Sequence, residues 1–259
     1  MWDEVHPVGL AKRKVFAWLE ALVVKHSHYV VLTAPSALSL YQKRYPEIAE
    51  DKWQFIPNGY SEEHFSKALA SEHYQRAMKV KTASQLVLLH SGYLYPLERD
   101  PSHFFAALAA LKARGVIDAD RVKIVLRSSG NDTLFAEKLA RLAIDDLVWL
   151  APAIGYTEAL VEMLLADGLL VFQAANCNHQ VPAMIYEYFR AGKPIFAMTD
   201  LAGDTAATLF SAGVFDIVDL NDQQAIENGL LSFLQSLLSE TVNGVDLKLA
   251  CQYSREYGV

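Results

Sequence analysis

Residues 176–194 contain the pattern best suited to chemistry, a polar loop that runs into a short helix. Pro182 suits the first position of that helix, and Gly192-Lys193-Pro194 would end it. The free N–H groups and positive dipole end of a helix N-terminus favour a diphosphate. Glu187 lies a little more than one turn into the helix, where its carboxylate could accept hydrogen bonds from a ribose diol. The alternative is a plain connector with a capping loop and a solvated glutamate.

A second candidate site follows the first strand of the predicted sheet. Gly92 has no Cβ, so a phosphate can approach its backbone closely. Arg99 offers a fork of donors that suits phosphate oxygens. The alternative is a loop glycine and a surface arginine paired with Glu98 or Asp100. In open α/β sheets, ligands bind at the carboxyl ends of the strands, which would bring Gly92 and Glu187 to one edge.

Four further residues sit at predicted strand ends or helix starts. Arg127 ends the second strand and could add a phosphate-binding charge, and a structural salt bridge is an equally good interpretation. Ser36 could cap a helix that begins at Pro35, and Asp204 is better explained as a cap than as a ligand. Tyr156 could stack on a bound base or pack in the core.

The composition is that of a soluble globular protein of 259 residues, 52% hydrophobic and 20% charged. Its net charge of -7 argues against a nucleic-acid-binding surface, which needs many Lys and Arg residues. Cys177 and Cys251 are too few for a disulfide framework or a thiolate metal site. No apolar run approaches the roughly 20 residues of a membrane span, and the N-terminus does not resemble a signal peptide. We therefore expect a cytoplasmic protein.

Several other chemistries lack their sequence patterns. No histidine pair has metal-binding spacing, and no Gly-x-Gly-x-x-Gly follows a strand, so neither a zinc site nor a nicotinamide cofactor is expected. No glycine-rich loop ends in Gly-Lys-Ser/Thr, which argues against a P-loop NTPase.

Residues 85–238 alternate short apolar runs with amphipathic helical patterns. Strands that are apolar throughout and separated by helices indicate a parallel sheet covered on both faces. We therefore predict an α/β domain with a doubly wound parallel sheet, whose strands lie at Leu86–Leu89, Val122–Leu126, Leu147–Leu150, Leu169–Phe172, Ile195–Met198 and Val214–Val218.

Residues 1–56 predict an incomplete second α/β unit. Its elements are a helix over Gly9–Lys25, a strand over Tyr29–Thr33, a helix from Pro35 to about Arg44 and a strand over Gln54–Ile56. Two parallel strands cannot bury both faces alone, so we expect the tail of a sheet whose beginning is missing. Residues 57–84 would connect the two units, and residues 239–259 would begin a further helical region at Tyr253–Tyr257. The chain thus reads as a fragment truncated at both ends.

The 176–194 segment resembles the donor-site motif of glycosyltransferase family 4, whose members have the two-domain GT-B fold. That motif has two glutamates separated by seven residues, and Glu187 matches the second, which binds the donor ribose in the family. His179 stands at the first position, next to the transferred sugar. It can donate a hydrogen bond but offers no carboxylate. Met184 stands where some subfamilies have a lysine.

The resemblance extends to three other segments. Pro57-Asn58-Gly59 is similar to the family's interdomain turn. Gly92 matches the glycine of the family's pyrophosphate-binding loop, Tyr93 replaces its arginine, and Arg99 takes the place of its lysine. Residues 149–154 match the strand and loop that border the nucleotide base. The resemblance therefore implies a catalytic role for His179, phosphate and nucleotide contacts from Gly92, Arg99, Gln180, Val181, Pro182 and Glu187, and base contacts from Ala151, Pro152 and Ile154. Arg127 is a further candidate phosphate contact from its place at the end of a strand.

What the resemblance implies is transfer of a hexose, with retention, from a nucleoside-diphosphate sugar to a glycan or lipid-linked acceptor. It implies no cofactor and no metal, and a lipid-linked acceptor leaves peripheral membrane association open. The acceptor domain is almost absent, so we expect this chain to bind nucleotide and to transfer sugar poorly. A sugar-nucleotide epimerase of the same fold is the rival enzyme. A degenerate, non-catalytic scaffold domain is the third alternative, and it would expose apolar area at the N-terminal unit.

Overall fold

The structure is a computed structural model that describes residues 9–80, 85–239, 241 and 244–257. Its main domain is a parallel sheet of six strands in the order β5-β4-β3-β6-β7-β8. The strands are β3 (Leu86–Ser91), β4 (Val122–Arg127), β5 (Val148–Ala151), β6 (Gly168–Gln173), β7 (Ile195–Thr199) and β8 (Ile217–Val218). This confirms the predicted doubly wound sheet.

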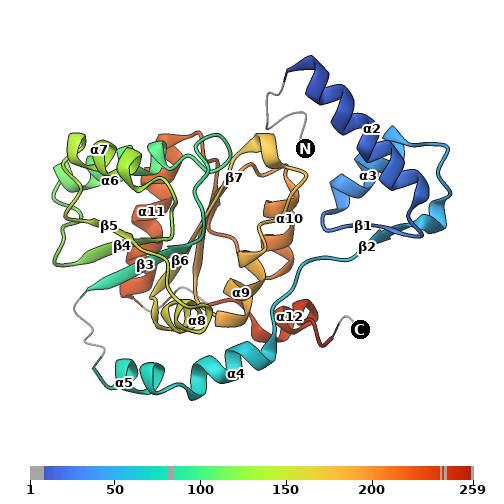
Figure 1. The fold of residues 1–259 in the computed structure, drawn as a ribbon. Coiled ribbons are helices and arrows are strands. Elements are labelled where there is room, and N and C mark those ends of the chain that lie inside the picture. The colour runs from blue at the N-terminus through green and yellow to red at the C-terminus, as the bar shows by residue number, and fades with distance from the viewer. Residues whose placement is uncertain (1–8, 81–84, 240, 242–243, 258–259) are drawn as a thin grey trace.

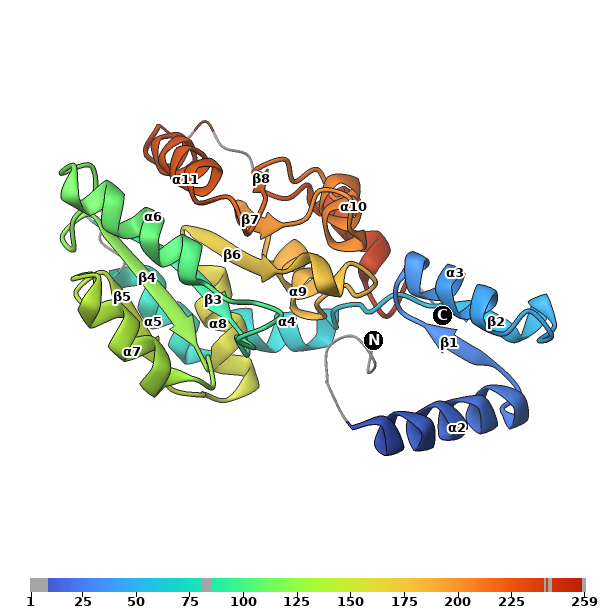
Figure 2. The same ribbon diagram turned by 90° about the horizontal axis from the view of Figure 1, so that it is seen from above.

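Helices cover both faces of this sheet (Figures 1 and 2). The helices are α6 (Ser102–Ala113), α7 (Asp132–Arg141), α8 (Tyr156–Leu165), α9 (Met184–Ala191), α10 (Asp204–Ser211) and α11 (Gln223–Leu238). Helices α6, α7 and α11 contribute to one buried cluster, and α8, α9 and α10 contribute to the other.

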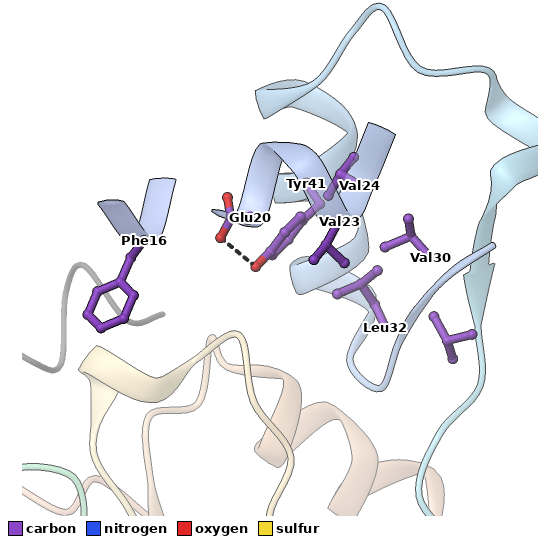
Figure 3. Close-up of a pocket in the computed structure, with 8 residues that line it drawn as sticks. Phe16, Glu20, Val23, Val24, Val30, Leu32 and Tyr41 are labelled. Carbon is purple, nitrogen blue, oxygen red and sulfur yellow. Dashed lines mark hydrogen bonds between the residues drawn. The ribbon is translucent and has the colours of Figure 1, made fainter. Parts of the chain in front are cut away.

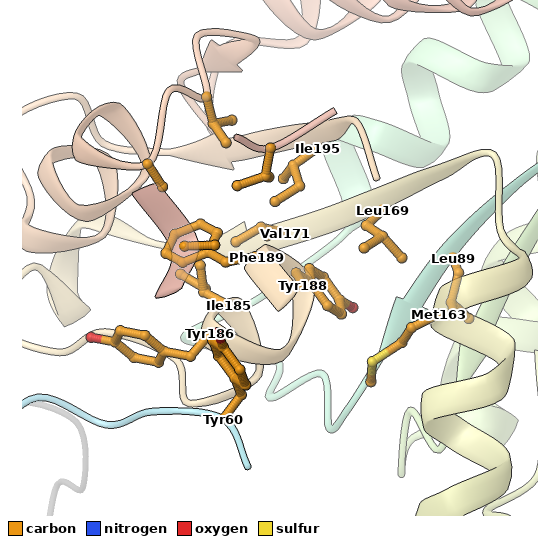
Figure 4. Packing of buried hydrophobic residues seen from close by; sticks show 14 of the residues in the cluster. Tyr60, Leu89, Met163, Leu169, Val171, Ile185, Tyr186, Tyr188, Phe189 and Ile195 are labelled. Atoms are coloured by element: carbon orange, nitrogen blue, oxygen red, sulfur yellow. The ribbon is translucent and has the colours of Figure 1, made fainter. Parts of the chain in front are cut away.

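Strand β6 explains why the predicted strands are apolar at every position. All six of its residues are buried. Leu169 and Val171 pack in the cluster of α8 and α9, which Figure 4 shows, and Leu170 and Phe172 pack in the cluster of α6 and α11. Successive strand side chains point to opposite faces, so a strand buried on both sides shows no polar alternation.

Strand β8 is shorter than predicted because its expected first residues belong to the end of α10. The backbone N–H of Val214 donates to the Leu209 carbonyl, and Gly213 adopts a positive φ of 80°. Such wrapping of a helix C-terminus satisfies carbonyls that the helix leaves free. Only Ile217 and Val218 then pair with β7.

The N-terminal unit is small and contains a two-stranded parallel sheet of β1 (Val30–Leu32) and β2 (Trp53–Phe55). Around it lie α2 (Leu10–His26), α3 (Pro35–Arg44) and the short helix η1 (Glu50–Lys52). The predicted helices are within a residue of these bounds, and the strands are shorter or shifted because only three residue pairs are in register. The unit stands beside the end of the sheet domain that carries α10 (Figures 1 and 2).

A buried carboxylate ties α2 to α3 in the N-terminal unit. Glu20 accepts hydrogen bonds from the hydroxyls of Tyr41 and Tyr45, at 2.9 and 2.7 Å, and pairs with Arg44. Next to this cluster, an apolar pocket of about 490 Å³ opens between α2 and β1 (Figure 3). Helix α2 also exposes large apolar side chains: Val15, Phe16, Trp18, Leu19 and Val23.

The connection between the two units is helical. It contains α4 (Glu62–Ala70) and α5 (Glu72–Val80), and α4 packs on α8 and α9, where Arg190 pairs with Glu62. Phe65 of α4 is fully buried against the sheet domain.

The end of the chain returns to this connection. After α12 (Leu247–Ala250) and the short helix η3 (Cys251–Tyr253), the predicted helix over Tyr253–Tyr257 is not found. Tyr60 instead forms a parallel bridge with Ser254, and the Arg255 N–H donates to the Tyr60 carbonyl. The extended conformation of Ser254 ends the helical run, because pairing with the connection requires it.

Candidate functional site

The sheet opens between β3 and β6, where the chain order reverses. These two strands share only the pairs Leu88↔Gly168 and Leu89↔Leu169. Beyond them, side chains bridge the gap: the His90 ring bonds to the Leu170 carbonyl at 2.9 Å. Reversal of strand order is where open α/β sheets form ligand crevices.

The buried side chains of His90 and Tyr188 lie at this opening. His90 is fully buried, and burial lowers its pKa to about 4, so its ring is neutral and Nδ1 carries the proton that bonds to Leu170. Its Nε2 has no hydrogen-bond partner among the described residues. The hydroxyl of Tyr188, from α9, accepts a 2.8 Å bond from the Ser91 N–H. Neither residue was predicted, because a buried histidine or tyrosine has the sequence signature of ordinary core.

Gly92 directly follows β3, and its conformation requires glycine. Its φ is +148°, and a Cβ placed there would lie 3.2 Å from the Met184 sulfur. The loop backbone therefore approaches the first residue of α9 closely. The structure thus brings together the predicted glycine and the predicted helix N-terminus.

Arg99 lies over the same opening. Its Nε donates to the Gln173 side chain and its Nη1 to the Tyr93 carbonyl, both at 3.2 Å. The guanidinium also lies 5.8 Å from the centre of the Tyr95 ring. Among the described residues no carboxylate forms an ion pair with it, and burial lowers its pKa. The alternative pairing with Glu98 or Asp100 is not formed. A half-buried cation with neutral partners can accept an anion.

Tyr93, in place of the family's arginine, folds away from this opening. Its hydroxyl donates to the Gly130 carbonyl at 3.3 Å, and its ring covers Gly130 so closely that a Cβ there would clash. Arg99 is therefore the cation that this loop offers.

The loop before α9 is tied to the Gly92 loop. The Ala174 N–H donates to the Glu98 carbonyl at 2.7 Å, and the Asn176 side chain donates to the Leu97 carbonyl. Gln180 is exposed, and its carbonyl accepts a hydrogen bond from the Thr205 hydroxyl.

Helix α9 begins at Met184, two residues later than predicted. Val181 and Pro182 are buried in the approach to the helix. The Ile185 N–H bonds to the Pro182 carbonyl, three residues back, so the entry is a tighter turn than α-helix. Gly192, with a φ of +69°, ends the helix as predicted.

Glu187 points from α9 toward the start of α8. Its carboxylate accepts a 2.6 Å hydrogen bond from the Tyr156 hydroxyl, and the His64 ring packs edge-on against Tyr156. Burial raises the pKa of Glu187, although the bond from Tyr156 and the positive charge of Arg255 act against this. The predicted ribose carboxylate therefore lies beside the loop predicted to border the base.

In that loop Ala151 is buried, and Pro152 and Ile154 are exposed. The Ala151 carbonyl accepts a bond from the Ser128 N–H. The Pro152 carbonyl accepts a 2.6 Å bond from Arg127.

Arg127 bonds to a carboxylate and to a backbone carbonyl. Nε and Nη2 bond to the two carboxylate oxygens of Glu162, at 2.9 and 2.6 Å, and Nη1 bonds to Pro152. The guanidinium also stacks on Trp149 at 5.1 Å and is only 7% exposed. Of the two interpretations that the sequence left open, the structure contains the salt bridge.

His179 lies at the boundary with the N-terminal unit. Its Nδ1 is 2.7 Å from the Ser36 hydroxyl, and that hydroxyl is also 2.7 Å from Asp204. Both predicted caps are corrected here. Ser36 is the second residue of α3 and makes no cap to its own helix, and Asp204 accepts bonds from Ser36 rather than from α10. The partners are 168 residues apart in sequence, so no local pattern could have revealed them.

The described ranges contain neither a metal-binding cluster nor a membrane-spanning helix. In these ranges no group of three His, Cys, Asp or Glu side chains could hold a metal ion. No helix in the described ranges is long and apolar enough to cross a membrane.

Comparison with known proteins identifies the fold. No protein-family model and no curated protein matches the sequence. Among solved structures, WaaG, a glycosyltransferase involved in lipopolysaccharide biosynthesis, superposes with a TM-score of 0.66 at 14% identity, over 98% of this chain and 67% of its own. HepE from Anabaena, in complex with UDP and glucose, gives 0.69 at 13% identity, over 93% and 63%. Sucrose-phosphate synthase from Thermosynechococcus elongatus gives 0.66 at 14% identity, over 94% and 58%.

The fold is that of GT-B glycosyltransferases. The chain spans about three fifths to two thirds of the length of these structures. At this identity the likeness establishes the GT-B fold, and function has to be argued from the site.

Proposed function

We propose that this chain is the donor-binding part of a family 4 glycosyltransferase, which transfers a hexose from a nucleoside-diphosphate sugar to a glycan or lipid-linked acceptor with retention. The observation that carries the proposal is Arg99, a half-buried guanidinium with only neutral partners, at the point where the sheet order reverses. An anion is the ligand that this environment lacks.

The arrangement around Arg99 supports a diphosphate in particular. The Gly92 backbone lies close to Met184 at the start of α9 there, and the N-terminus of a helix favours an anion. Glu187 lies in the first turns of the same helix, where it can accept hydrogen bonds from ribose hydroxyls. The loop at Ile154 would then border the base.

The proposed chemistry breaks the C–O bond between the anomeric carbon and the diphosphate and forms one to the acceptor hydroxyl oxygen, whose proton passes to the leaving diphosphate. Negative charge develops on the leaving diphosphate, so a fixed cation such as Arg99 stabilises the transition state more than the ground state. We assign no covalent nucleophile and expect no metal requirement. His179 is the proposed catalytic residue beside the transferred sugar.

A second candidate, a non-catalytic scaffold domain, is favoured by the surface of α2. Its apolar side chains Trp18 and Val23 are 61% and 65% exposed, which fits a surface that mates with another polypeptide. This candidate differs from the first in predicting no nucleotide affinity.

Thermal unfolding in the presence of UDP, GDP, dTDP and ADP separates the two candidates. A ligand at about 100 times its Kd adds roughly 2.7 kcal/mol to stability, which corresponds to a rise on the order of 5–10 °C in Tm. We expect one nucleotide to give this shift, and Glu187→Ala to abolish it. A folded protein that responds to none of the four would favour the scaffold.

A further inference from the structure

Ser36 connects two polar groups of the sheet domain across the boundary with the N-terminal unit. Its hydroxyl is 2.7 Å from Asp204 Oδ2 and 2.7 Å from His179 Nδ1. Its backbone N–H donates to the same Asp204 oxygen at 2.9 Å. Ser36 belongs to α3, whereas His179 lies in the loop before α9 and Asp204 is the first residue of α10.

The direction of these hydrogen bonds follows from what each group can donate. An ionised carboxylate only accepts, so the single hydroxyl proton of Ser36 must point to Asp204. If that proton pointed to His179, two oxygens carrying only lone pairs would face each other at 2.7 Å. The Ser36 oxygen therefore accepts from His179, and the proton of the neutral imidazole lies on Nδ1.

Asp204 is held in place for this role by α3. Ser36 is the second residue of that helix, and its N–H has no partner within the helix. The Asp204 carboxylate accepts from this N–H and lies at the positive end of the α3 dipole. The carboxylate therefore caps a helix of the other unit, and the contact forms only while the two units are docked.

We propose that Ser36 is a positioning residue that fixes His179 as the Nδ1–H tautomer. The Nε2 atom of the neutral ring is then a hydrogen-bond acceptor, and it has no partner among the described residues. This inference rests on the proposed function, in which His179 replaces a glutamate beside the transferred sugar. A carboxylate at that position accepts hydrogen bonds from sugar hydroxyls, and the Ser36 contact gives the imidazole the same property. Docking of the N-terminal unit thereby completes the donor site.

The tautomer can be measured directly by NMR on the full chain with ¹⁵N-labelled histidine, at a pH where the rings are neutral. Two-bond proton–nitrogen correlations distinguish a protonated Nδ1 from a protonated Nε2. His179→Gln identifies the signal among those of the 8 histidines. We expect Nδ1–H at His179 in the wild type, transfer of the proton to Nε2 in Ser36→Ala, and retention of Nδ1–H in Ser36→Thr.

Ser39→Ala is the matched control, because the Ser39 hydroxyl bonds only to the Pro35 carbonyl of the same helix. It should leave the His179 signal unchanged. An Nε2–H ring in the wild type would overturn the proposal, and so would an unchanged Nδ1–H ring in Ser36→Ala. The wild-type spectrum decides even if Ser36→Ala does not fold. Titration of the same sample with UDP, GDP, dTDP and ADP tests the donor site separately, since the tautomer is set without nucleotide.

Discussion

The hydroxyl of Tyr156 donates a 2.6 Å hydrogen bond to the carboxylate of Glu187, joining the first turn of α8 to that of α9. Tyr156 begins the helix that follows the Ala151–Ile154 loop, so this bond connects the proposed base-binding and ribose-binding parts of the site. It also holds a half-buried carboxylate that a nucleotide would find already oriented.

Glu187→Gln should weaken nucleotide binding while stabilising the free protein. Gln still accepts from Tyr156, but its neutral amide makes weaker bonds to a ribose, so we expect about a tenfold loss of affinity. Burial raises the pKa of Glu187, so the folded state holds its proton more tightly than the unfolded state. Stability therefore falls as pH rises through this raised pKa.

The Tm of Glu187→Gln should consequently exceed that of the wild type at neutral pH and match it in acid, below the ordinary pKa of glutamate. Glu158→Gln is the control, because Glu158 is exposed and accepts only from the Gly155 N–H. A Glu187→Gln protein that binds nucleotide as tightly as the wild type would remove Glu187 from the site.

Arg127→Ala should destabilise the protein without changing nucleotide affinity. It leaves Glu162, whose side chain is 23% exposed, without its bidentate partner, and we expect a cost of about 3 kcal/mol. Urea unfolding measures this cost. Arg121→Ala breaks an exposed pair with Asp118 and should cost much less. If Arg127→Ala instead had unchanged stability and lost nucleotide affinity, Arg127 would have to be assigned as a phosphate contact.

His90 should make the protein sensitive to mild acid. Burial lowers its pKa from 6.5 to about 4, so between these pH values the unfolded state is protonated and the folded state is not. Stability is then lost as pH falls through this interval, by roughly 3 kcal/mol in full.

Glutamine does not titrate between pH 6.5 and about 4 and can still donate to the Leu170 carbonyl. The stability of His90→Gln should therefore fall less than that of the wild type over this pH interval. His26→Gln, at an exposed position in the last turn of α2, should behave as the wild type. Parallel pH profiles for wild type and His90→Gln would show that His90 accepts its proton without unfolding.

The sheet was predictable because its strands are buried on both faces. Leu169–Phe172 has no polar position, and this local signal requires no knowledge of its neighbours. The same holds for Gly192, whose position before Lys193 and Pro194 is a local helix stop.

Polar contacts were predictable only between residues that lie close together in the sequence. Whether Arg127 meets a phosphate or Glu162 depends on a residue 35 positions away, and the sequence left both interpretations open. The Ser36–Asp204 contact spans 168 positions and two structural units. Local helix-cap preferences assigned both residues to their own helices, and the tertiary contact overrode them.

The central claim, an anion site at Arg99, is tested most directly by calorimetric titration of the wild type and Arg99→Ala. The ligands are the nucleoside diphosphate that raises the Tm and its unphosphorylated nucleoside. Loss of a charged hydrogen bond of about 1.5–3 kcal/mol predicts that Arg99→Ala weakens diphosphate binding by roughly 10- to 100-fold and leaves nucleoside binding unchanged. Equal affinity of wild type and Arg99→Ala for the diphosphate would contradict the account.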